Sequence, residues 1–259
     1  MPNKIFSLLA YLKYWLFKED KYSLQSPFLF RIYQELFIFL SGRKESDLDI
    51  EEIRNNLLNS AVTIKVDDFG AGSKKVNTQI RRISDITKYS TSSRKFAQLY
   101  QYFCILTPAK IVLELGTCMG LTSRYLSRIT SGTTYTFEGS EEIKAIAMGS
   151  ESFENLNFIQ GEINETLPEI LRRVDHVDFA LIDANHTYDG TMNAYNQIKG
   201  KVLPTSILAI GDIHWSPEME TAWKEISNLE EVKLSLDFFE CGIIFFESPV
   251  PKNHFILSI

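Results

Sequence analysis

The spacing of hydrophobic positions changes sharply in the middle of the chain. An apolar run at 111–115 ends in a loop that holds Gly116 and Gly120, and hydrophobic residues then recur at helical spacing over 121–129. Gly116 allows a sharp turn, and Gly120 leaves room for a ligand or a strand to approach the helix. The pattern predicts strand, tight turn and helix, an arrangement in which a nucleotide-like ligand meets a helix N-terminus.

Short strand-like runs and helix-like runs alternate through the rest of the chain, which is typical of an open α/β sheet. The last two strands, joined at 240–242, read as an antiparallel hairpin. We expect the charged stretch 43–52 to be an exposed linker. The expected strands are 133–138, 157–160, 177–183, 206–212, 232–239 and 242–246, and the expected helices include 27–40, 77–89, 96–104, 167–174, 191–199 and 218–226.

Composition narrows the class of protein. The 259 residues can bury a sizeable core, and 44% hydrophobic with 23% charged residues is usual for a soluble globular protein. A net charge of −6 without a long basic run argues against nucleic acid as a partner. The three cysteines are scattered, which favours free thiols in a reducing cytoplasm over disulfides or zinc.

The N-terminal run Ile5–Phe17 is strongly apolar and aromatic, but lysines interrupt it and it is too short to span a bilayer. We expect a helix that docks on the catalytic domain or on a second copy in a homodimer. The alternative is a peripheral membrane anchor, with Tyr11, Tyr14 and Trp15 at the level of the lipid headgroups.

A second glycine-rich loop lies at 68–75. Its backbone N–H groups could form a nest for an anion, and Lys74 and Lys75 add positive charge. The sequence therefore offers two interpretations of equal weight: a site for a phosphate- or carboxylate-bearing substrate, or a polar turn before a helix.

Two carboxylates stand where the first two strands of the alternating region end. Glu114 precedes Gly116, where a carboxylate would repel a pyrophosphate but suits a cationic or hydroxyl-rich ligand. Glu138 ends the next strand, at the spacing at which Rossmann-like folds present a carboxylate to ribose hydroxyls. The residues at 118 and 121 are not the glycines of a dinucleotide fingerprint, so an NAD-dependent oxidoreductase is disfavoured.

The string Glu114-Leu-Gly-Thr-Cys-Met-Gly120 resembles motif I of class I methyltransferases that depend on S-adenosylmethionine (SAM), above all the small-molecule O-methyltransferases of the catechol and caffeoyl-CoA type. The resemblance covers about residues 92–248. It implies a Rossmann-like seven-stranded sheet of order 3-2-1-4-5-7-6, whose last strand is antiparallel, with helices on both faces. It also implies SAM as the cofactor.

The resemblance assigns the cofactor-binding residues by position. Glu114 would meet the amino end of SAM directly or through water, Glu138 would hold the ribose, and Glu162 and Ile163 would flank the adenine. The full set is Glu114, Gly116, Thr117, Gly120, Thr122, Glu138, Gly161, Glu162, Ile163 and Asp183.

Two later strands carry candidate catalytic residues at their carboxyl ends. Asp183 with His186 follows the run 177–182, and Asp212 with His214 follows the run 206–211; Trp215 comes next and is a candidate for binding the acceptor. Carboxyl ends of parallel strands share one edge of the sheet, so we expect these groups to meet there. A histidine held by an aspartate would serve as general base.

A divalent cation held by Asp183 and Asp212 is the alternative to a histidine base. Caffeoyl-CoA-type enzymes place an Asp-Asn pair after the fifth strand, whereas this chain has Ile213 at the Asn position. That departure makes metal the less favoured interpretation.

We therefore expect a helical N-terminal extension over residues 1–90 and a SAM-binding methyltransferase domain over 91–259. The expected activity is methyl transfer to a small-molecule acceptor, at an oxygen. Two alternatives stay open: a binding or scaffold protein that kept the fold without the chemistry, and a methyltransferase of a lipid-linked substrate at the membrane surface.

Overall fold

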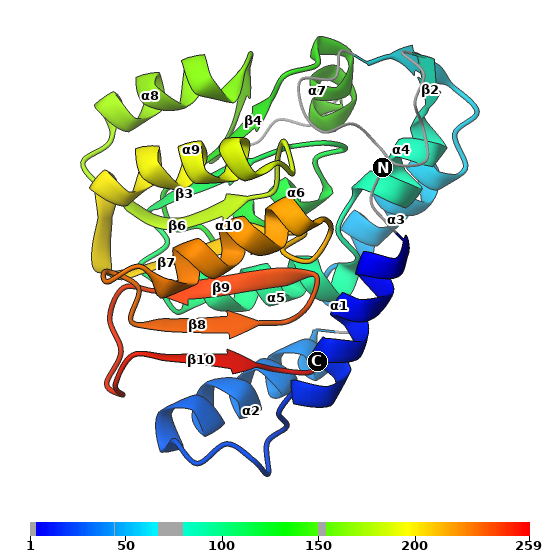
Figure 1. Cartoon of the computed structure of the whole chain (residues 1–259). Coiled ribbons are helices and arrows are strands. Elements are labelled where there is room, and N and C mark those ends of the chain that lie inside the picture. Colours follow the sequence, from blue (N-terminus) through cyan, green and yellow to red (C-terminus); the bar gives the residue numbers. More distant parts are fainter. Residues whose placement is uncertain (1–3, 44, 67–79, 150–153) are drawn as a thin grey trace.

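The computed structural model describes all residues except 1–3, 44, 67–79 and 150–153. In this part of the chain one twisted sheet of eight strands runs through the molecule (Figure 1). Along the sheet the strands are β10 (Asn253–Ile256), β8 (Leu234–Asp237), β9 (Cys241–Phe245), β7 (Val202–Gly211), β6 (Val177–Ile182), β3 (Ile111–Leu115), β4 (Thr133–Glu138) and β5 (Leu156–Gln160).

The strand order confirms the expected fold. Strands β3 to β7 are parallel, and β9 pairs antiparallel with both β7 and β8, which reproduces the order 3-2-1-4-5-7-6 with an antiparallel last strand. The sequence did not predict β10, which adds an eighth strand parallel to β8. Leu257 at its end is buried, and Glu19 of the N-terminal segment pairs with it. Contacts with the N-terminus therefore hold this edge strand.

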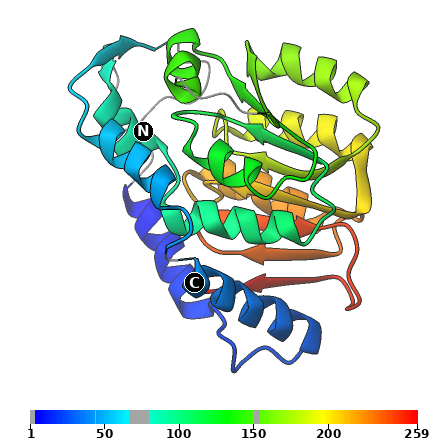
Figure 2. The same ribbon diagram turned by 180° about the vertical axis from the view of Figure 1, so that it is seen from behind.

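Helices cover both faces of the sheet, as the alternating pattern predicts (Figures 1 and 2). Two apolar clusters lie on either side of the strands, one against α5 and the other against α8, α9 and α10. The helices of the alternating region are α5 (Arg94–Ile105), α6 (Leu121–Ser127), α7 (Glu141–Met148), α8 (Ile163–Arg173), α9 (Tyr188–Ile198) and α10 (Pro217–Asn228), with the short 3-10 helix η1 (Lys199–Lys201) after α9.

The N-terminal third adds helices around this core. Helix α2 (Pro27–Gly42) begins at its Ser26 cap and packs on α5, so its apolar face joins the core beside the sheet. Helix α1 (Lys4–Phe17) runs along the side of the molecule where β8 and β10 end (Figure 1). The division at residue 90 remains a prediction.

Two local predictions in this third were wrong. The stretch 43–52 is not an exposed linker, because α3 (Leu48–Leu58) begins inside it and the buried carboxylate of Asp47 accepts from Gln98 of α5. The helix expected over 77–89 is α4 (Ile83–Ser90), since β2 (Ile80–Arg82) pairs first with β1 (Thr63–Lys65). The glycine-rich loop 68–75, for which the sequence left open an anion site or a polar turn, lies outside the described residues.

Among the described residues, no helix is long and apolar enough to cross a membrane.

Candidate active site

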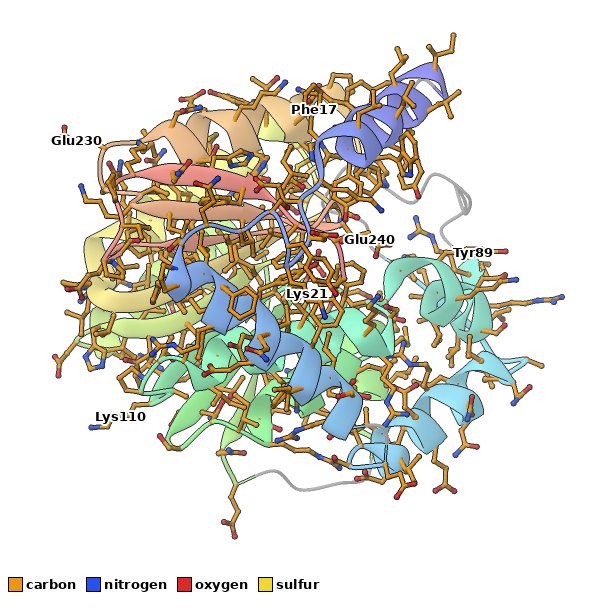
Figure 3. All side chains as sticks on the ribbon, turned by 90° about the horizontal axis from the view of Figure 1, so that it is seen from below. Phe17, Lys21, Tyr89, Lys110, Glu230 and Glu240 are labelled. Atoms are coloured by element: carbon orange, nitrogen blue, oxygen red, sulfur yellow. The ribbon has the colours of Figure 1, made fainter. Side chains whose placement is uncertain are left out.

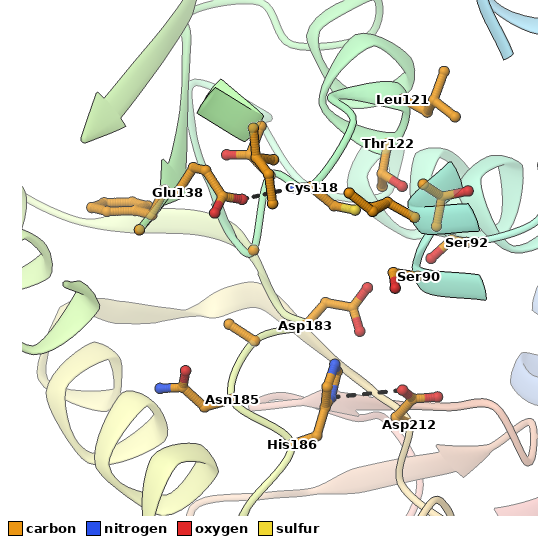
Figure 4. A pocket seen from close by; sticks show the side chains of 18 of the residues that line it. Ser90, Ser92, Cys118, Leu121, Thr122, Glu138, Asp183, Asn185, His186 and Asp212 are labelled. Carbon is orange, nitrogen blue, oxygen red and sulfur yellow. Dashed lines mark hydrogen bonds and ion pairs between the residues drawn. The ribbon is translucent and has the colours of Figure 1, made fainter. Parts of the chain in front are cut away.

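A cavity of about 560 Å³ opens at the carboxyl ends of the parallel strands, a volume usual for a small-molecule site (Figure 4). This is the edge at which ligands bind in open α/β sheets. Its walls come from the loops after β3, β4, β5, β6 and β7, from β2, α4 and the start of α5 with the segment between these helices, and from the turn between β8 and β9.

The glycine loop after β3 forms one wall and packs closely on β6. Gly116 has a φ of +105°, and a Cβ placed there would lie 2.4 Å from the backbone oxygen of Asp183. Any side chain at Gly116 would therefore collide with the backbone at the end of β6. Thr117 and Thr122 also line the cavity, whereas Gly120 caps α6 and does not line it.

Glu138 lies at the end of β4 with its carboxylate held in place. Oε2 accepts from the backbone N–H of Cys118 at 3.0 Å, and Oε1 accepts from the backbone N–H of Ser140 at 3.0 Å. These bonds fix the carboxylate at the cavity wall, and carboxylate oxygens are acceptors suited to ligand hydroxyls. Gly161, Glu162 and Ile163 line the same end of the cavity from the loop after β5.

Glu114 lies inside the protein rather than on the cavity wall. Its Oε2 accepts from the hydroxyl of Thr136 at 2.6 Å and from the hydroxyl of Ser123. Burial raises the pKa of Glu114 to about 8, and these two hydroxyls act in the opposite direction. Burial therefore favours the protonated form of this carboxyl group. Contact of Glu114 with the amino end of SAM, directly or through water, stays a prediction; in this structure the hydroxyls of α6 and β4 surround the group.

Asp183, His186 and Asp212 gather at the other end of the cavity (Figure 4). One ligand atom from each residue lies within 4.8 Å of the others, and His186 Nδ1 is 3.7 Å from Asp212 Oδ2. His186 and Asp212 have φ values of 39° and 53°, which residues with side chains rarely adopt. Both loops are thus held in strained turns that aim the side chains into the cavity.

The surroundings of Asp183 shift its acidity. Burial raises the pKa of Asp183 to about 6, the charge of Asp212 also raises it, and His186 and a hydrogen bond from Ser92 lower it. A carboxyl group with a pKa near 6 can exchange a proton at neutral pH.

His214 does not join this group, although the sequence suggested that it would. Its Nε2 lies 2.7 Å from Asp237 Oδ2, and its ring stacks on Phe239 with centroids 5.4 Å apart. The chain turns after Asp212, where the N–H of Trp215 bonds the Asp212 carbonyl, and this turn directs His214 toward β8 and buries Ile213. Trp215 lines the cavity, with its ring 6.1 Å from that of His186.

Several lining residues were missed by sequence reasoning. Ser92 and Tyr100 come from the start of α5 and its first turns, and Glu240 comes from the turn between β8 and β9. Burial raises the pKa of Glu240, and Asp212 raises it further. The polar run 90–93 between two helices could have indicated that this segment lines a site, whereas the sequence around Glu240 gives no such indication. Lys74 and Lys75 lie outside the described residues.

Comparisons with known proteins agree with this geometry. Residues 113–213 match the family model of a methyltransferase domain. No curated protein matches the sequence. Solved structures match at probability 1.00, and three of the most similar belong to methyltransferases.

The structure of the O-methyltransferase from Bacillus cereus in complex with S-adenosylhomocysteine (SAH) has a TM-score of 0.51 and 16% identity, and the match covers 60% of this chain and 83% of that one. The SAH-bound methyltransferase from Podospora anserina has a TM-score of 0.51 and 16% identity, over 61% and 81% of the two chains. The O-methyltransferase of tomaymycin synthesis from Streptomyces achromogenes, in complex with SAM, has a TM-score of 0.50 and 14% identity, over 62% and 83%. Residues 113–213 thus resemble a methyltransferase domain, and the chain shares the Rossmann-like fold of these methyltransferase structures.

Proposed function

We propose that the protein transfers the methyl group of SAM to an oxygen atom of a small-molecule acceptor. The observation that carries the proposal is the layout of the cavity. Glu138 and the glycine loop line one end, and Asp183, His186 and Asp212 line the other. A single cavity therefore joins groups suited to hold a nucleoside with groups suited to take a proton.

The residues at the first end fit the cofactor. The Glu138 carboxylate, fixed by Cys118 and Ser140, can accept from both ribose hydroxyls. Gly161, Glu162 and Ile163 lie beside it, where the adenine ring would be flanked. When bound, SAM supplies a methyl group that its sulfonium already activates toward displacement.

The chain then has three tasks: to align the acceptor, to exclude water and to receive one proton. The carbon–oxygen bond forms as the carbon–sulfur bond breaks, and the acceptor hydroxyl loses its proton. His186 is placed to take that proton. The Asp212 carboxylate, 3.7 Å from Nδ1, would stabilise the resulting imidazolium.

The charges at this end favour a neutral or cationic acceptor. Asp183, Asp212 and Glu240 contribute three carboxyl groups to the lining, and His186 stands among them; Arg81 lines the cavity as well and is outnumbered by these acids. A phosphate or carboxylate brought against these groups would be repelled. The O-methyltransferases among the similar structures support oxygen as the acceptor atom. An anionic acceptor held by Lys74 and Lys75 stays the sequence-based alternative.

Asp183, His186 and Asp212 could instead hold a divalent cation. Two carboxylates and one imidazole suit such an ion, which would lower the pKa of the acceptor hydroxyl. Ile213, where caffeoyl-CoA-type enzymes have an Asn ligand, is buried and offers no donor atom. We therefore favour His186 as the base.

The experiment that tests the function has two stages. Calorimetric titration with SAH measures cofactor binding, and SAM with a labelled methyl group, incubated with a panel of phenols, catechols, amines and hydroxy acids, measures transfer. We expect SAH binding and a labelled ether product. Binding of SAH with no transfer to any acceptor class would favour a binding protein with a silent site, and transfer to nitrogen alone would contradict the choice of oxygen.

A further inference from the structure

Helix α1 carries an apolar stripe whose side chains remain about half exposed in the folded chain. Its six residues recur at spacings of three and four, so they share one face of the helix. Each has between 48% and 68% of its surface exposed, although all are large hydrophobic residues. Figure 3 shows α1 at the margin of the molecule, with side chains projecting from it. The stripe consists of Ile5, Leu8, Leu9, Leu12, Trp15 and Leu16.

The stripe faces outward because the other side of α1 is anchored to the protein. Ala10 is buried, and the hydroxyl of Tyr14 donates to the backbone oxygen of Leu257 at 2.9 Å. The rings of Tyr11 and Tyr14 pack on Phe239, with centroids 5.3 and 5.1 Å away. Rotating α1 to hide the stripe would break these contacts. The orientation of the helix is therefore set by the fold.

The stripe is large for the surface of a single protein. Each side chain of this size carries on the order of 150–200 Å² of surface, so the six together expose roughly 500–700 Å². The largest apolar patch on a typical monomer is about 300–600 Å² and is often functional. A surface of this size calls for a partner.

The charges around the stripe indicate which partner fits. Between residues 4 and 18 the sequence has three lysines (Lys4, Lys13 and Lys18) and no acidic residue, while the whole chain has a net charge of −6. Glu19 and Asp20 follow directly, and Lys13 Nζ lies 3.9 Å from Glu220 Oε1, so the excess of positive charge at the helix is small. A basic, apolar and aromatic helix on an acidic protein complements an anionic lipid surface. A second copy fits less well, because a twofold pairing of α1 helices would bring lysines toward lysines.

The length of α1 determines how it could lie on such a surface. Its 14 residues span about 21 Å, which is shorter than the hydrocarbon core of a bilayer at about 30 Å. A helix of this length cannot cross the core, so it would lie in the plane of the interface, with Trp15 at the level of the headgroups. We propose that α1 docks the protein on an anionic lipid surface through this stripe.

Co-sedimentation with vesicles tests the proposal on the full chain. Wild type should sediment with vesicles that contain phosphatidylglycerol, should not sediment with pure phosphatidylcholine, and should be released by high salt. The double variant Leu8→Gln/Leu16→Gln should bind at least about tenfold more weakly, since two apolar side chains leave the interface. Equal binding of this variant, or no binding by wild type, would overturn the proposal.

The matched control is Ile38→Gln/Ile80→Gln, which removes two isoleucines of similar exposure on α2 and β2. It should sediment like wild type, and a loss equal to that of the stripe variant would overturn the role of α1. SAH binding and circular dichroism verify that both variants are folded.

Sedimentation velocity tests whether a second copy of the chain, rather than lipid, covers the stripe. A wild-type dimer that the stripe variant converts to a monomer would assign the stripe to a second copy and overturn docking on lipid.

Discussion

The carboxylate of Asp183 occupies the space where a side chain at Gly211 would lie. A Cβ at Gly211 would be 1.9 Å from Asp183 Oδ1, and one at Gly116 would be 2.4 Å from the backbone oxygen of the same residue. These two glycines, on β7 and after β3, flank β6 and form a slot that holds Asp183. The glycine loop near the cofactor end and the acid at the acceptor end are thus coupled by direct packing.

Gly211→Ala should displace the Asp183 carboxylate and lower methyl transfer. Asp183 lies beside His186 and Asp212, so its displacement should also misplace the proposed base. A shift of about 1 Å in a reacting group can cost on the order of a hundredfold in rate, and we expect a loss of up to that size in kcat. SAH affinity should change less, because Glu138 lies at the other end of the cavity. The matched control is Gly200→Ala, since nothing lies within 4 Å of a Cβ at Gly200. If the two variants had equal kcat, the close packing of Gly211 on Asp183 would not matter for methyl transfer.

Glu138→Ala should weaken SAH binding by at least about tenfold, since hydrogen bonds to a charged group contribute roughly 1.5–3 kcal/mol. Glu138→Gln keeps one acceptor oxygen and should bind with intermediate affinity. Calorimetric titration measures both variants, with the exposed Glu154→Gln as control. If Glu138→Ala bound SAH as tightly as wild type, the ribose would lie elsewhere in the cavity.

The stability of the protein without ligand should fall as the pH rises from about 6.5 to 8. The pKa of Glu114 is about 8 in the fold against 4.5 for the free side chain, so the folded state holds a proton that the unfolded state has lost. The free energy of unfolding then decreases with pH across this window, by at most about 1.4 kcal/mol per unit. Asp183 also makes the free energy of unfolding decrease with pH, but this contribution ends near its own pKa of about 6.

Chemical denaturation at several pH values measures this slope. Glu114→Gln keeps the size of the side chain and cannot ionise, so its stability should be nearly flat between about pH 6.5 and 8. Asp183→Asn serves as the control and should retain the slope of wild type. An unchanged slope in Glu114→Gln would assign the effect to another group.

The two histidines at the strand ends should respond differently to substitution. His186→Gln removes the proposed base and should lower kcat by about a hundredfold or more, with little change in SAH affinity. His214→Gln removes the partner of the buried Asp237 and should mainly lower thermal stability. Rate assays and thermal unfolding of both variants check this. A larger loss of kcat in His214→Gln than in His186→Gln would reverse the assignment.

Removal of divalent cations should leave methyl transfer intact. Incubation with EDTA followed by dialysis, and then an assay with and without added Mg²⁺, distinguishes His186 as base from a cation held by Asp183, His186 and Asp212. Activity lost with EDTA and restored by Mg²⁺ would show that this cluster binds a cation. In that case Asp212→Asn should weaken Mg²⁺ activation more than it weakens SAH binding.

The order of elements and the edge of the sheet that holds the cavity could be predicted from the sequence alone. Hydrophobic period distinguishes strands from helices, and parallel strands joined by crossover helices bring their carboxyl ends to one edge. That reasoning was enough to bring Asp183 and Asp212 to a common site. The glycines at 116 and 120 marked the turn because a residue with a side chain could not follow that path.

The direction of individual side chains depended on tertiary contacts between distant segments. His214 was expected beside Asp183, but the turn after Asp212 directs it to Asp237, which lies 23 residues further along the chain. The hydroxyls of Ser123 and Thr136, which donate to the buried Glu114 carboxylate, come from α6 and β4, and no local pattern marked them as its partners. Glu240 reaches the cavity from a hairpin whose sequence carries no sign of a site.

For helix α1 too, the sequence predicted the helix itself, whereas tertiary contacts set its orientation. The sequence by itself determined that 5–17 is apolar and helical, because period and composition are local properties. Only the tertiary structure decided which side of the helix is covered, since that depends on Phe239 and Leu257, far along the chain. Local sequence sets backbone conformation, whereas the face that a helix buries and the partner that a polar group finds depend on free energies of contact between segments that the sequence keeps apart.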